Sequence, residues 1–79
     1  MRLPRDLSGE QLIRSLCRRW DYQRIGQVGS HVVLVTEDPS HQRIVVPAHK
    51  SLRVGTLNAI LRSVAAHKSV SKNEILKTL

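Results

Sequence analysis

The chain has 79 residues and a formal net charge of +7, from 13 Lys and Arg against 6 Asp and Glu. This length suits one domain, so residues 1–79 are expected to fold as a unit. The single cysteine excludes an intramolecular disulfide, and no group of Cys and His has the spacing of a zinc site. A domain this basic favours a polyanion or an acidic protein as its partner.

Composition and hydropathy argue against two further classes. With one Trp, one Tyr and no Phe, the chain lacks the set of aromatic residues on which many single-stranded RNA platforms stack bases. No apolar stretch is long enough for a signal peptide or a membrane-spanning helix. We therefore expect a cytoplasmic protein that does not contact the membrane.

The N-terminal part is expected to form a helix over Gly9–Arg19, after an irregular start at residues 1–5. Ser8 and Gln11 have the spacing of a capping box. Apolar residues then recur at helical spacing, at Leu12, Ile13, Leu16, Cys17 and Trp20. Basic residues occupy the opposite face, at Arg14, Arg18 and Arg19. Cys17 is thus interpreted as a buried apolar residue rather than a reactive thiol.

Three short strands are expected next, over residues 22–27, 31–36 and 42–46. Residues 28–30 and 37–40 have turn composition, so the strands should form an antiparallel meander. The middle strand has four consecutive apolar residues, Val32, Val33, Leu34 and Val35. Both of its faces are therefore suited to burial, and a second chain, including another copy of this one, could cover the face that helices leave open. The alternative is an aliphatic pair left on the surface.

Two helices are expected to complete the chain. Thr56 is predicted to be the N-cap of the first. Apolar residues recur at helical spacing after it, at Leu57, Ile60, Leu61 and Val64. Ser71 and Glu74 have the spacing of a second capping box, which predicts a short terminal helix.

The resulting order, α-β-β-β-α with a short C-terminal helix, predicts an α+β fold. The helices should pack on one face of a three-stranded antiparallel sheet. Double-stranded-RNA-binding domains share this arrangement, although topology alone says little about function.

Few residues could carry chemistry. The sequence has no glycine-rich phosphate loop, no pair of placed carboxylates and no nucleophile elbow. The sequence therefore argues against a two-metal nuclease, and we expect neither a metal nor a cofactor. Any hydrolytic chemistry would have to use histidine and cations.

His31 is the histidine best placed for such chemistry. It follows Gly29 and Ser30, which are small enough for a large substrate to approach, and turn N–H groups can hold a phosphate oxygen. It opens the central strand, so the sheet would hold its backbone while the ring reaches solvent. The alternative is a polar residue that merely begins a strand.

The other three histidines are weaker candidates. His49 follows Pro47 in a basic stretch, where a phosphate contact and a local hydrogen bond are both open. His41 and His67 are interpreted as ordinary solvated side chains.

RNA cleavage is a reaction that a histidine can catalyse without a metal. The nucleophile, the 2′-hydroxyl beside the scissile phosphate, is part of the substrate. A neutral imidazole can accept its proton because imidazole titrates near ambient pH. A nearby Lys or Arg can then stabilise the charge that builds on the phosphate. The product would end in a 2′,3′-cyclic phosphate, and DNA would be spared.

Four features follow one another along the chain: Gly29-Ser30-His31, the aliphatic strand after it, Val45-Val46-Pro47-Ala48-His49, and Gly55-Thr56-Leu57 with Ile60-Leu61. In this order they resemble the HicA mRNA-interferase toxins, also called YcfA-like proteins. The similarity covers residues 7–64, and residues 71–79 look like the short C-terminal helix of many members.

The resemblance implies a double-stranded-RNA-binding-like fold and a ribosome-independent ribonuclease that degrades mRNA and halts growth. The family's catalytic histidine falls on His31, which stands in the Gly-Ser-His motif, and His49 matches a frequent second histidine. The resemblance also implies a HicB-family antitoxin that binds the toxin and masks its histidine.

One departure concerns the cation of the site. Members often carry Arg or Lys just before the Gly-Ser pair, where this chain has Gln27 and Val28. We therefore assign phosphate contact to Arg24, the nearest upstream cation, and to Lys50 and Arg53.

The leading hypothesis is a toxin endoribonuclease in which His31 is the general base or acid. Gly29, Ser30 and His49 are expected to contact RNA beside the three cations, and the arginines of the first helix to bind its backbone. Two alternatives are an RNA-binding module without catalysis and a protein-interaction domain whose basic surface serves an acidic partner.

Overall fold

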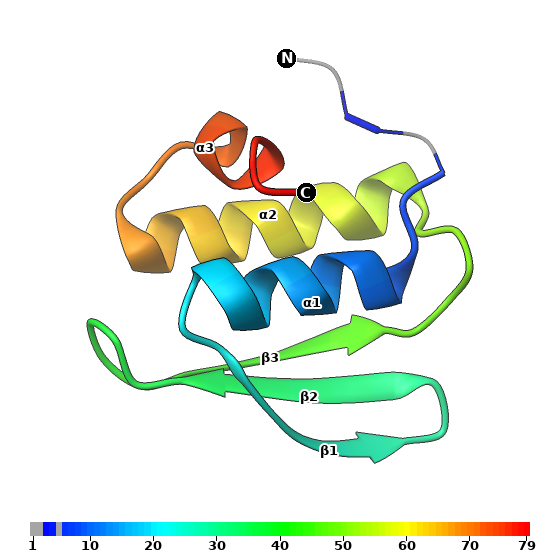
Figure 1. Ribbon diagram of the computed structural model, residues 1–79, viewed down its shortest axis with the longest axis horizontal. Helices are drawn as coiled ribbons and strands as arrows, with labels where there is room; N and C mark the ends of the chain where they lie inside the picture. The colour runs from blue at the N-terminus through cyan, green and yellow to red at the C-terminus, as the bar shows by residue number, and fades with distance from the viewer. Residues whose placement is uncertain (1–2, 5) are drawn as a thin grey trace.

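The computed structural model describes residues 3–4 and 6–79, and one helix, three strands and two further helices follow one another along it (Figure 1). The elements are α1 (Gly9–Arg19), β1 (Gln23–Val28), β2 (His31–Thr36), β3 (Gln42–Pro47), α2 (Val54–Lys68) and α3 (Lys72–Leu76). This order confirms the predicted α+β fold. The irregular start expected for residues 1–5 lies partly outside the described residues.

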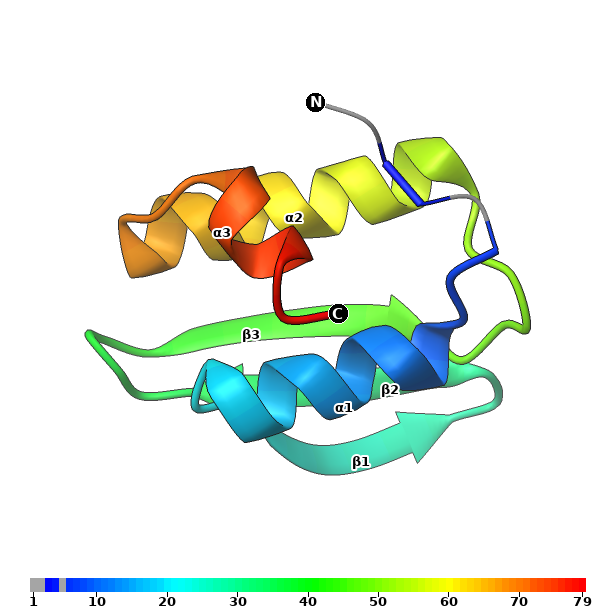
Figure 2. The same cartoon turned by 45° about the horizontal axis from the view of Figure 1, so that its top comes forward.

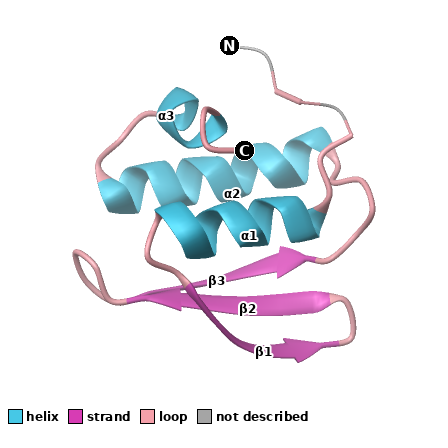
Figure 3. Ribbon diagram, in the orientation of Figure 1, coloured by secondary structure: helices cyan, strands magenta, loops and turns pink. Residues whose placement is uncertain are grey.

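The three strands form an antiparallel sheet in the order β1-β2-β3. All three helices lie on the same side of this sheet, as Figures 1 and 3 show, and the turned view in Figure 2 agrees. The prediction that the helices cover one face is therefore confirmed. The other face of the sheet carries no layer from the described residues.

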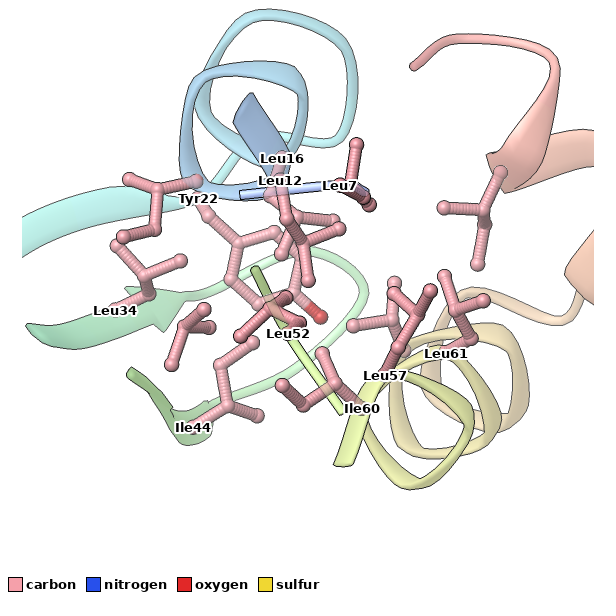
Figure 4. Packing of buried hydrophobic residues seen from close by; sticks show 14 of the residues in the cluster. Leu7, Leu12, Leu16, Tyr22, Leu34, Ile44, Leu52, Leu57, Ile60 and Leu61 are labelled. Carbon is pink, nitrogen blue, oxygen red and sulfur yellow. The ribbon is translucent and has the colours of Figure 1, made fainter. Parts of the chain in front are cut away.

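The core lies between the sheet and the helices, and each layer contributes residues with no exposed surface (Figure 4). They include Leu12 and Leu16 of α1, Val32 and Leu34 of β2, Leu57 and Leu61 of α2, and Ile75 of α3. Tyr22 is also buried, and its hydroxyl donates a hydrogen bond to Oε1 of Gln42. Burial raises the pKa of Tyr22 to about 12, so the hydroxyl remains a donor at neutral pH.

The first helix begins as the capping box predicts. Ser8 Oγ accepts from the backbone N–H of Gln11, and Gln11 Oε1 accepts from the backbone N–H of Ser8. Cys17 packs partly buried against the core, and burial raises the pKa of its thiol despite the opposing charge of Arg24. Its interpretation as a buried apolar residue holds only in part, because Cys17 packs against the core but stays partly exposed.

Four elements have boundaries that differ from the predicted ones by one to three residues. The second long helix begins at Val54 with Arg53 as its N-cap, not at Thr56, and the backbone N–H of Leu57 donates to the carbonyl of Arg53 at 2.9 Å. The first strand is shifted because the β1–β2 loop is only two residues long. The C-terminal ends of β3 and α3 also differ. β3 includes Pro47, which pairs with His31 on β2, and α3 ends at Leu76.

The alternation of β2 decides which of its side chains face the helices. Val32, Leu34 and Thr36 are buried on the helix side, and the residues between them point to the opposite face. That face, which we call the open face, carries His31, Val33 and Val35. Residues paired across neighbouring strands share a face, so the open face also includes Val28, Val45 and Pro47.

Candidate nucleolytic site at the beginning of β2

A two-residue turn places His31 at one end of the sheet. Val28 pairs with His31, which leaves Gly29 and Ser30 as the whole loop. Gly29 has φ +59° and Ser30 is not among the residues with positive φ, a pattern that fits a type II′ turn. Glycine is favoured at this first position because other residues are strained there. The sequence motif Gly-Ser-His thus builds a tight hairpin with His31 just after it.

His31 is exposed on the open face of the central strand. Its neighbours across the sheet are Val28 on β1 and Pro47 on β3. Two flanking strands hold its backbone, and neither neighbour offers a group that would compete for the ring. The sheet therefore fixes the backbone that carries the imidazole, and the exposed ring is open to a substrate. A general base or acid needs this geometry.

The segment after β3 is held against the Gly-Ser turn. The backbone N–H of Ala48 donates to the carbonyl of Ser30 at 2.6 Å, and Ser30 Oγ shares a hydrogen bond of 3.3 Å with Nε2 of His49. The structure thus brings His49 and Ser30 together, at the same end of the sheet as His31. The local hydrogen bond left open for His49 is present.

The N-terminus of α1 fixes this segment from the other side. The backbone N–H of Gly9 donates to the carbonyl of His49 at 2.9 Å. The approach is so close that a Cβ at Gly9 would lie 1.8 Å from the carbonyl oxygen of Pro47. Figure 1 shows the β1–β2 turn, the end of β3 and the start of α1 at one end of the molecule.

The connection from Ala48 to Arg53 carries the two downstream cations. The backbone N–H of Leu52 donates to the carbonyl of Leu7 at 2.8 Å, and Leu52 is buried. With the Gly9–His49 hydrogen bond, this contact anchors the connection at two points. Lys50 and Arg53 are exposed on it.

Arg24 lies on a different face from His31. A β-bulge between Arg24 and Gly26 places Arg24 opposite Leu34, a core residue, so its side chain leaves β1 on the helix side. There it forms an ion pair of 3.2 Å with Glu10 of α1. A phosphate would have to compete with Glu10 for this guanidinium.

Gln27 stands just before the turn and hydrogen-bonds to both Arg24 and Gly29. Its Oε1 accepts from Arg24 at 2.8 Å, and its Nε2 donates to the carbonyl of Gly29 at 2.9 Å. The amide therefore links Arg24 to the turn and secures the turn itself. Simple alternation would put Arg24 and Gln27 on opposite faces, so this contact could not be found from the sequence without the bulge.

The remaining two histidines lie at the opposite end of the sheet, near the β2–β3 hairpin. His41 Nδ1 is 2.8 Å from a carboxylate oxygen of Glu37, and His67 Nε2 is 2.8 Å from the carbonyl oxygen of Ser40. The first contact is local, the second joins the end of α2 to the β2–β3 loop, and both are structural. Only His31 and His49 stand at the candidate site.

Among residues 3–4 and 6–79, no group of three His, Cys, Asp or Glu side chains could hold a metal ion. In the same part of the chain, no helix is long and apolar enough to cross a membrane. The groups available for chemistry at the site are the exposed imidazole of His31 and the imidazole of His49, which is hydrogen-bonded to the Ser30 hydroxyl. The exposed cations Lys50 and Arg53 lie on the anchored connection.

The fold and site define a small basic α+β domain with an exposed histidine at the start of its central strand. The family model described as the HicA toxin of bacterial toxin-antitoxin systems matches residues 9–65, more than two thirds of the chain. The chain therefore belongs to the HicA toxin family. Searches of curated proteins and of solved structures found no match.

Proposed function

We propose that this protein is an endoribonuclease toxin that cuts mRNA in the cytoplasm, with His31 as its catalytic residue. The single observation that carries the proposal is the position of His31, exposed beside a glycine turn and braced by two strands. Membership of the HicA toxin family supports the toxin role. The basic charge of the chain supports an RNA substrate.

The proposed reaction needs no group besides the protein and the RNA. His31 accepts the proton of a ribose 2′-hydroxyl, and the oxygen attacks the adjacent phosphorus. The bond from phosphorus to the 5′ oxygen breaks, and that oxygen leaves with a proton from solvent. The products are a 2′,3′-cyclic phosphate and a 5′-hydroxyl end.

Cations and turn amides are proposed to hold the phosphate. Lys50 and Arg53 are exposed on the anchored connection that follows the site, and the backbone of Gly29 and Ser30 is accessible at the turn. Arg24 would join them by exchanging Glu10 for the phosphate. Such charges stabilise the phosphorane more strongly than the ground state.

A HicB-like antitoxin is the proposed partner of the open face. That face exposes Val28 (77%) and Val45 (38%), with Gln23 and Arg43 beside Val35, and His31 lies within it. A chain that buries these side chains would cover His31 at the same time. Binding of the antitoxin would then neutralise the toxin by blocking the access of RNA to His31.

We expect Val45→Gln to weaken neutralisation without changing cleavage, since Val45 lies on the open face away from the Gly-Ser turn. The measurement is titration of purified antitoxin into a cleavage assay. Equal neutralisation of variant and wild type would place the antitoxin elsewhere. If the free toxin is instead a dimer that Val45→Gln dissociates, a second copy occupies the face.

Incubation of the purified chain with end-labelled RNA tests the proposed activity. We expect cleavage in the presence of a metal chelator and no cleavage of DNA of the same sequence, because DNA lacks the 2′-hydroxyl. RNA binding that weakens with salt but gives no product would indicate a binding module. No affinity for RNA at moderate salt would indicate a protein-interaction domain.

A further inference from the structure

A basic groove runs along α1 on the side away from the sheet. One wall is formed by Arg14, Arg18 and Arg19 of α1, and the other by Thr78 and Leu79 of the C-terminal segment. Its volume is about 280 Å³. The C-terminal wall lies outside the part of the chain that matches the HicA family, residues 9–65.

The C-terminal wall is held in place by a small polar network. Ser15 Oγ donates to the carbonyl of Thr78 at 3.0 Å and lies 2.8 Å from its hydroxyl, while the indole N–H of Trp20 donates to the Thr78 hydroxyl at 3.0 Å. Just before this point, Ile75 of α3 is fully buried in the core. The groove is therefore preorganised, because both of its walls belong to the packed fold.

Within the described residues, the arginines of the groove have no carboxylate partner at ion-pair distance. The ion pairs of this part of the chain are Arg24–Glu10 and His41–Glu37. Arg18 and Arg19 lie in the last turn of α1, where the helix dipole favours a cation. Arg14 lies in the middle of the helix and four residues before Arg18, where two like charges destabilise a helix.

Guanidinium groups at this spacing are suited to phosphate oxygens, which they can bind through paired hydrogen bonds. We propose that the groove between α1 and the C-terminal segment binds the phosphate backbone of RNA, as a second contact separate from His31. Along α1, Arg18 lies about 14 Å beyond Gly9, the helix residue beside the candidate site. An RNA that reaches both places must therefore extend several nucleotides past the scissile phosphate.

The proposal rests on RNA as the substrate of the proposed function, but its test does not depend on cleavage. The probe is a 2′-O-methyl RNA about twelve nucleotides long, which lacks the nucleophile and matches the site sizes of single-strand binders. Binding is followed by anisotropy of the labelled RNA and by the fluorescence of Trp20, the only Trp of the chain, whose indole contacts the groove wall.

We expect Arg14→Gln to lower the affinity about fivefold and to reduce the slope of log K against log salt by about 0.7, the contribution of one phosphate contact. The matched control is Arg62→Gln, which removes another exposed arginine, from the middle of α2. It should change the affinity little. A trinucleotide, too short to span both contacts, should bind the wild type more weakly than the twelve-nucleotide probe does.

Equal losses for Arg14→Gln and Arg62→Gln would overturn the proposal, because the arginines would then act only through net charge. Competition by polyglutamate without any RNA binding would assign the groove to an acidic protein and overturn it as well. If RNA binds as expected but is never cut, the groove stands and the proposed activity fails. Thermal unfolding of each variant checks that the helix is intact.

Discussion

His31→Ala is expected to reduce RNA cleavage by about 10²- to 10⁴-fold, the usual contribution of a positioned general acid or base. The ring is exposed, so its removal leaves no cavity and the thermal unfolding midpoint should stay within a few degrees of wild type. RNA affinity should be largely retained, because the proposed phosphate contacts belong to other residues. Expression of the variant should no longer arrest growth.

His41→Ala is the matched control for this substitution. His41 is also an exposed histidine, but it lies in the β2–β3 loop and pairs with Glu37 near the opposite end of β2. Its loss should leave cleavage unchanged. A His31→Ala protein that folds and cuts RNA at the wild-type rate would remove His31 from the catalytic role.

Gly9→Ala is expected to lower the free energy of unfolding by about 2 kcal/mol or more, the range of a backbone overlap in a packed site. The new Cβ would fall 1.8 Å from the carbonyl oxygen of Pro47 and 2.9 Å from the Cα of Ala48. Both obstacles are backbone, so either α1 or the end of β3 must move. The hydrogen bond from Gly9 N–H to the carbonyl of His49 would lengthen with that movement.

The matched control is Gly55→Ala, which changes a glycine in the first turn of α2. No atom lies within 4 Å of a Cβ built at Gly55, so this variant should keep or slightly raise stability. Chemical denaturation of both variants measures the difference. Because Pro47 pairs with His31, Gly9→Ala should also reduce cleavage at temperatures where it remains folded. Equal stability of the two variants would show that α1 does not need this close approach.

Local patterns were sufficient to predict most of the fold. The capping box of Ser8 and Gln11 and the apolar spacing of α1 identify this helix to the residue, because both signals depend only on neighbours in sequence. The β-branched run at His31–Thr36 identifies β2 in the same way. The start of α2 was missed because Arg53 caps it without a side-chain hydrogen bond, so no capping residue marks the position.

The site was less predictable than the fold, because its contacts join distant segments. The role of Gly9 depends on where Pro47 ends its strand, which no local pattern specifies. The signal in the sequence is a glycine at the first position of a strongly predicted helix, which could have indicated a close backbone approach there. The turn around His31, in contrast, could be predicted because Gly29 and Ser30 are its immediate neighbours.

The protein itself is proposed to transfer a phosphoryl group from the 5′ oxygen to the neighbouring 2′ oxygen of RNA. Mass spectrometry of the new ends tests this proposal most directly, with wild-type protein, a metal chelator and one defined RNA. We expect a 2′,3′-cyclic phosphate on one fragment and a 5′-hydroxyl on the other. A 3′-hydroxyl with a 5′-phosphate, or cleavage that the chelator abolishes, would contradict the proposal.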